Sequence, residues 1–97
     1  MKVTFSRTGG FMPINLNVQL DTEAMNAGEA KQLQRLIEDS GVMLMQGAEV
    51  KGARDMHYYT IRIERDGQAH RVRFDQVSIP SSVKPLLDFL ISRAKPI

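Results

Sequence analysis

The clearest pattern in the chain is the stretch from residue 57 to residue 74, which reads HYYTIRIERDGQAHRVRF. Apolar and aromatic side chains alternate with polar ones on both sides of Asp66-Gly67. Alternation with a period of two is typical of a half-buried strand, and Asp-Gly favours a tight turn because both central residues of a type I′ turn need positive φ. We therefore expect an antiparallel hairpin whose inward side chains are His57, Tyr59, Ile61, Ile63, His70, Val72 and Phe74.

Two further strands are predicted nearer the start of the chain. Residues 2–6 alternate, and residues 14–20 alternate more clearly, with Ile14, Leu16, Val18 and Leu20 on one side. Between them lie Gly9-Gly10 and Pro13. Glycine permits positive φ and proline has no amide hydrogen for a sheet, so this segment is predicted to be a mobile connection.

Two helices complete the pattern. The first is predicted from a capping box at residues 26–29, from apolar residues at helical spacing, and from Gly41 as the residue after its end. Residues 42–45 are apolar and too few for periodicity to separate a strand from the tail of that helix. A second helical pattern runs from Val83 to Ile91 with Pro85 in its first turn, and predicts that the chain ends as a helix.

These elements predict an α+β fold. Four strands with polar outer faces, one hairpin and two amphipathic helices indicate a four-stranded antiparallel sheet with both helices packed on one face. A length of 97 residues suits a single domain spanning residues 1–97.

The composition narrows the class of protein. The chain has no cysteine, which removes disulfides, thiolate nucleophiles and cysteine zinc sites. It has no apolar run suited to a signal peptide or a membrane span, so we expect a cytoplasmic protein without a membrane partner. The net charge of +2 comes from scattered basic residues, which is weak support for nucleic-acid binding.

No arrangement typical of an enzyme is present in the sequence. His57 and His70 are the only histidines, and two ligands are too few for a metal site, so we interpret them as core residues with hydrogen-bond partners. There is no His-Glu-x-x-His run, no nucleophile elbow and no phosphate-binding loop. We therefore expect a protein that is not an enzyme and has no cofactor, no metal of its own and no small-molecule substrate.

Two loops leave alternatives open. Phe11 and Met12 lie beside the glycine pair, where they either fold back over the sheet edge or contact a partner. Asp55 lies where a loop meets a strand, a position at which aspartate is often a simple turn residue.

The order and spacing of several short motifs resemble the emfourin family across nearly the whole chain. The residues that carry the resemblance are Phe5-Ser6-Arg7-Thr8-Gly9-Gly10-Phe11, Leu20-Asp21-Thr22 before a helix, Asp55-x-x-x-Tyr59-x-Ile61-x-Ile63, His70-x-Val72, and Ile79-Pro80 with Pro85-Leu86-Leu87-Asp88-Phe89-Leu90. The chain departs from the family pattern at His57, where relatives often have an aromatic or apolar residue. It also departs at Asn26-Ala27, which replaces a proline-rich helix start.

The resemblance implies a protein inhibitor of protealysin-like proteases, which belong to the thermolysin family and carry a catalytic zinc ion. In that mechanism an aspartate coordinates the enzyme's zinc while apolar residues of a neighbouring loop occupy substrate subsites. Carried over to this chain, the apolar loop is Gly9, Gly10, Phe11 and Met12. The aspartate is inferred to be Asp55, because it opens the Asp-x-x-x-Tyr pattern.

The sequence also allows an alternative function. Tyr58, Arg62, Arg71 and Arg73 point outward from the predicted hairpin, and such a face suits a nucleic-acid or general protein-binding module. Glu64 and Asp66 interrupt this basic stripe, which favours an ordinary solvated sheet face.

Overall fold

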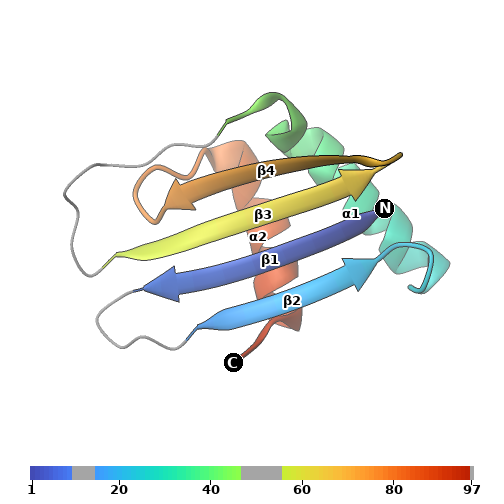
Figure 1. Cartoon of the computed structure of the whole chain (residues 1–97), viewed down its shortest axis with the longest axis horizontal. Helices are drawn as coiled ribbons and strands as arrows, with labels where there is room; N and C mark the ends of the chain where they lie inside the picture. Colours follow the sequence, from blue (N-terminus) through green and yellow to red (C-terminus); the bar gives the residue numbers. More distant parts are fainter. Residues whose placement is uncertain (10–14, 47–55, 97) are drawn as a thin grey trace.

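A computed structural model describes residues 1–9, 15–46 and 56–96. Within these residues the chain forms one antiparallel sheet with strand order β4-β3-β1-β2-β5 and two α-helices behind it (Figure 1). The strands are β1 (Lys2–Gly9), β2 (Leu16–Asp21), β3 (His57–Arg65), β4 (Gln68–Asp75) and β5 (Lys95–Pro96). The helices are α1 (Ala27–Ser40) and α2 (Lys84–Arg93), with short 3₁₀ helices η1 (Val42–Leu44) and η2 (Ser81–Val83).

The hairpin predicted from residues 57–74 is confirmed. β3 and β4 pair antiparallel with Arg65 opposite Gln68, which leaves Asp66 and Gly67 as the two-residue turn. Their φ angles are +52° and +77°, as a type I′ turn requires.

The α+β class and the helix-covered antiparallel sheet are confirmed, but the prediction of four strands is wrong because a fifth strand follows α2. The prediction that the chain ends as a helix is also wrong. Ala94 is extended, with φ −74° and ψ 150°, and the next two residues pair with Leu16 and Asn17 of β2. Pro96 cannot continue a helix, but an edge strand tolerates it because the outer side of that strand needs no amide donor.

The ends of α1 follow the sequence signals. The side chain of Asn26 accepts a hydrogen bond from the backbone N–H of Gly28 at 2.8 Å, and Gly41 ends the helix with φ +74°. The residues left open at 42–45 form η1 rather than a strand, with Val42 fully buried and Leu44 94% exposed.

His70 of β4 holds η1 in place. Its Nε2 lies 2.8 Å from the carbonyl oxygen of Val42 and 2.8 Å from that of Met45. Carbonyl oxygens only accept, so Nε2 carries the proton and donates to both. The interpretation of His70 as a core histidine with partners is therefore confirmed.

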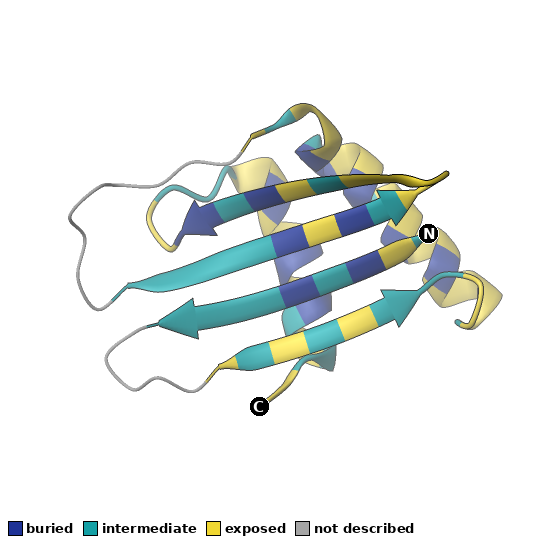
Figure 2. Cartoon of the chain, in the orientation of Figure 1, coloured by how far each residue is buried: buried dark blue, intermediate teal, exposed yellow. Residues whose placement is uncertain are grey.

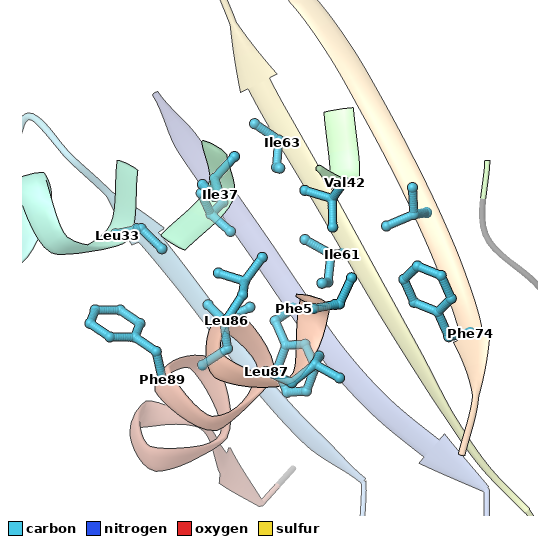
Figure 3. Close-up of a cluster of buried hydrophobic side chains, with 14 residues drawn as sticks. Phe5, Leu33, Ile37, Val42, Ile61, Ile63, Phe74, Leu86, Leu87 and Phe89 are labelled. Atoms are coloured by element: carbon cyan, nitrogen blue, oxygen red, sulfur yellow. The ribbon is translucent and has the colours of Figure 1, made fainter. Parts of the chain in front are cut away.

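Both helices pack on the same face of the sheet, and the core lies between them and the strands (Figure 3). The buried cluster contains Val3, Phe5, Leu33, Ile37, Val42, Ile61, Ile63, Val72, Phe74, Val83, Leu86, Leu87, Phe89 and Leu90. The predicted alternation explains which strand residues enter it, because odd-numbered residues of β1 and β3 and even-numbered residues of β4 share the helix side. Neither described helix is long and apolar enough to cross a membrane.

The opposite face of the sheet is polar, and the described helices leave it open (Figure 2). The strand register places its side chains in cross-strand rows. One row contains Asn17, Ser6, Thr60 and Arg73, and the next contains Gln19, Thr4, Arg62 and Arg71. The four hairpin residues kept for the second function, which include Tyr58, are therefore neighbours on this open face.

Candidate functional site at the loop end of the sheet

The two segments that the sequence analysis singled out, which contain Phe11 and Asp55, join the sheet at the same end. We call it the loop end, and define it by Gly9, Met56, His57 and the turn at residues 75–78 (Figure 1). β1 ends at Gly9 directly opposite His57, where β3 begins. Residues 10–14 follow Gly9 in the chain, and residues 47–55 precede Met56.

Of the five predicted contact residues, the structure describes Gly9 alone. Gly10, Phe11, Met12 and Asp55 lie outside the described residues. What the structure gives is the placement of the residues bonded to them. Gly9 precedes Gly10 and Met56 follows Asp55 in the chain, so the geometry between Gly9 and Met56 sets where both segments join the sheet.

That geometry is tight. Gly9 has φ +81°, and a Cβ atom added to it would lie 2.6 Å from the carbonyl oxygen of Met56 and 3.5 Å from the Tyr58 ring. Real Cβ atoms essentially never come so close to a backbone oxygen. Glycine is thus required here for two reasons, its left-handed backbone and its missing side chain.

His57 is not the hydrogen-bonded core histidine that the sequence predicted. Its Nδ1 is buried, yet it has no hydrogen-bond partner among the described residues, and the same holds for Nε of Arg7. Both side chains belong to the helix side of the sheet at the loop end, because Arg7 is opposite Tyr59 and His57 is opposite Gly9.

The two histidines are also too far apart to share a metal ion. His70 is opposite Ile63, whereas His57 lies six residues earlier in β3, a separation of about 20 Å along a strand. Within residues 1–9, 15–46 and 56–96, no group of three histidine or carboxylate side chains is placed to hold a metal.

The turn after β4 is joined to the start of β3 by backbone and side-chain hydrogen bonds. Gln76 donates its N–H to the carbonyl oxygen of His57 at 3.0 Å, and its Oε1 accepts the His57 N–H at 2.8 Å. Asp75 is fully buried, and its Oδ1 accepts the N–H of Val77 at 2.9 Å. Sequence reasoning missed this turn, although an aspartate at the end of a strand is a recognised turn signal.

Beside that turn, the open face carries an aromatic and a cation. The guanidinium of Arg73 lies 4.5 Å above the ring of Tyr58, a cation–π geometry. Tyr58 is opposite both Thr8 and Asp75. The loop end therefore joins Gly9, Tyr58 and the turn into one continuous rim.

The far end of the sheet has a different character. An open depression of about 410 Å³ lies there, and its lining includes Lys2, Asp21, Arg62, Glu64 and Asp66. Both positive and negative side chains line it, so it presents no field of one sign to a charged ligand.

Comparison with known proteins identifies the family. A family model, described as Emfourin, matches residues 5–91, from the middle of β1 to the last turns of α2. This chain belongs to the emfourin family. Emfourin is an inhibitor family, so membership fits a protease-inhibitor role with a protease as the partner, and it is consistent with a protein that is not an enzyme. No curated protein and no solved structure matched the chain.

The emfourin match includes the whole loop end. Gly9, Met56, His57 and the turn at residues 75–78 all fall inside residues 5–91, whereas β5 falls outside them.

Proposed function

We propose that this emfourin-family chain inhibits a thermolysin-like zinc metalloprotease by blocking its active site with two neighbouring segments. Asp55 is the residue aimed at the catalytic zinc of the target. Gly9, Gly10, Phe11 and Met12 form the segment that occupies the substrate subsites. The sheet and its helices act as the rigid base from which both segments extend.

The observation that carries this proposal is the contact between the bases of the two segments. The Gly9 Cα lies so near the Met56 carbonyl that no side chain fits between them. Residues 9 and 56 are far apart in the sequence, and the antiparallel pairing of β1 with β3 brings them together. An aspartate and an apolar side chain borne on adjacent bases are able to enter one cleft together.

The chemistry of the target favours this division of roles. A catalytic zinc ion keeps three protein ligands and one open position for water. A carboxylate oxygen at ~2.0–2.2 Å from the metal takes that position and removes the attacking nucleophile. The bound segment is then not hydrolysed, while Phe11 fills a pocket shaped for a bulky apolar side chain.

The direct test is the inhibition constant of purified variants against thermolysin and a protealysin-like protease. Asp55→Asn keeps the size of the side chain and removes its charge, so we expect most of the inhibition to be lost. Phe11→Ala is expected to weaken binding by ~2 kcal/mol or more, about 30-fold in the inhibition constant.

A matched control is available on α1. Asp39 has a side chain that is 71% exposed, and it forms only a surface ion pair with Arg35 at 3.9 Å. Asp39→Asn makes the same chemical change away from the loop end and should leave the inhibition constant unchanged. If Asp55→Asn inhibits as well as Asp39→Asn, the role of Asp55 is excluded.

One observation favours the second function, a nucleic-acid or general binding module. The structure gathers Arg62, Arg71 and Arg73 on the open face, with Arg62 directly opposite Arg71. Two of these cations already have partners, since Arg62 pairs with Glu64 and Arg73 packs on Tyr58. We therefore rank this function below inhibition.

A further inference from the structure

The turn after β4 exposes an apolar side chain at the loop end. Val77 is 62% exposed and lies in the turn that follows β4. A single exposed apolar residue is ordinary on a protein surface and is no argument by itself. Val77 differs from an ordinary exposed residue because hydrogen bonds hold the backbone around it.

Hydrogen bonds fix the backbone on both sides of Val77. The buried carboxylate of Asp75 accepts the Val77 N–H at 2.9 Å, and the carbonyl oxygen of Asp75 accepts the Ser78 N–H at 3.2 Å. Burying a carboxylate is costly unless it gains hydrogen bonds. Here a fully buried one accepts a hydrogen bond from the turn that displays an apolar residue.

The same turn is tied to the start of β3. Gln76 exchanges two hydrogen bonds with His57, through its backbone N–H and its side-chain Oε1. His57 comes two residues after Asp55 in the chain. Val77 is therefore held in a fixed position next to the base of the segment that bears the proposed zinc ligand.

We propose that Val77 is a third contact between this protein and its target protease, packing on an apolar patch at the rim of the active-site cleft. This inference rests on the proposed function. A backbone already fixed in the free protein loses little conformational entropy on binding, and valine is stiff at χ1, so even a small apolar contact adds to affinity. Tyr58 on the neighbouring rim suits an interface, because tyrosine is one of the residue types that often dominate interface energies.

The experiment compares two exposed apolar residues. Inhibition constants against thermolysin and a protealysin-like protease are measured for wild type, Val77→Ala, Val77→Asp, Leu44→Ala and Leu44→Asp. Leu44 is 94% exposed and lies on η1, which contacts β4 at His70. His70 is five residues from Asp75, or about 17 Å along the strand, so Leu44 is a control away from the turn.

We expect Val77→Ala to raise the inhibition constant about 5- to 10-fold, Val77→Asp to raise it further, and both Leu44 variants to leave it within about twofold. The Val77 side chain is exposed and its backbone bonds remain in every variant, so thermal unfolding should match wild type. As a measurement free of substitutions, the Val77 methyl signals of the wild-type protein should broaden or shift when protease is added, while those of Leu44 stay unchanged.

Three results would overturn the inference. Val77→Asp could inhibit as well as wild type, the Leu44 variants could weaken inhibition equally, or the Val77 methyl signals could ignore the protease. Each of these leaves the proposed function standing if wild type inhibits and Asp55→Asn does not. A wild-type protein that inhibits neither protease refutes the proposed function, and the third contact falls with it.

Discussion

Gly9 and Met56 are in backbone contact at the end of the sheet, with 2.6 Å between the place of a Gly9 Cβ and the Met56 carbonyl oxygen. This contact joins β1 and β3, which are neighbours in the sheet although they are far apart in the sequence. It also sets the spacing between the two segments proposed to enter the protease.

Gly9→Ala should therefore impair both stability and inhibition. The positive φ costs about 1–2 kcal/mol for an L residue, and the clash with Met56 must in addition push β1 and β3 apart. We expect a loss of about 2–4 kcal/mol in the free energy of unfolding, measured by urea denaturation. The inhibition constant should rise at least about tenfold, because the two segment bases separate.

A Gly67→Ala variant separates the cost of the positive φ from the cost of the clash with Met56. Gly67 has φ +77°, close to that of Gly9, but nothing lies within 4 Å of an added Cβ. This variant should lose only the ~1–2 kcal/mol of backbone strain and should inhibit as wild type does. Equal effects of the two substitutions would show that the Met56 contact is unimportant.

His70→Phe should destabilise the protein without changing its inhibition. The substitution keeps an aromatic ring but removes the donor shared by the Val42 and Met45 carbonyls. The Val42 carbonyl keeps the Met45 N–H as a donor, whereas the Met45 carbonyl loses the His70 donor, and an unsatisfied buried acceptor costs about 1–3 kcal/mol. Urea denaturation should report that loss, while the inhibition constant of the folded protein stays unchanged because His70 is about 17 Å from the turn at the loop end.

Much of the fold follows from local pattern, and the exceptions have physical reasons. In the hairpin the apolar residues recur with a period of two, and in both helices they recur at helical spacing. Each pattern covers many residues, so its signal is strong. β5 contains two residues and η1 three, and segments so short have no period to detect. β1 runs to Gly9, three residues beyond the predicted end, because pairing with β3 continues through residues that locally resemble a loop.

The candidate site depends on pairing that no local pattern contains. The sequence could mark the glycine segment and Asp55 as unusual, yet nothing in either segment says that β1 lies next to β3. The strand order and register supply that relationship, with Gly9 opposite His57. The buried Asp75 was missed as well, since it lies on the polar side of the hairpin, where strand alternation predicts an exposed side chain.

Asp75→Ala should loosen the turn that presents Val77. The substitution removes the acceptor of the Val77 N–H, and the loss of a hydrogen bond to a buried carboxylate costs about 1.5–3 kcal/mol. Hydrogen exchange at the Val77 amide should accelerate strongly relative to the Ile61 and Ile63 amides in the core strand. The inhibition constant should rise by an amount similar to that of Val77→Ala; an unchanged constant with a loosened turn would mean that order in the turn does not matter for binding.

Neutralising the open face should leave inhibition intact. Arg71 and Arg73 lie on the face that the described helices leave uncovered, and Arg71 is remote from the loop end, opposite Arg62. We expect the double variant Arg71→Gln with Arg73→Gln to inhibit within about threefold of wild type, the small loss coming from the Arg73 contact with Tyr58. Wild type and the double variant also test the second function. If the open face is a nucleic-acid site, wild type binds a labelled single-stranded oligonucleotide at low salt and releases it as the salt concentration rises. The double variant then does not bind the oligonucleotide. Binding with that salt dependence, together with no inhibition of thermolysin by wild type, would make the sheet face the functional surface in place of the loop end.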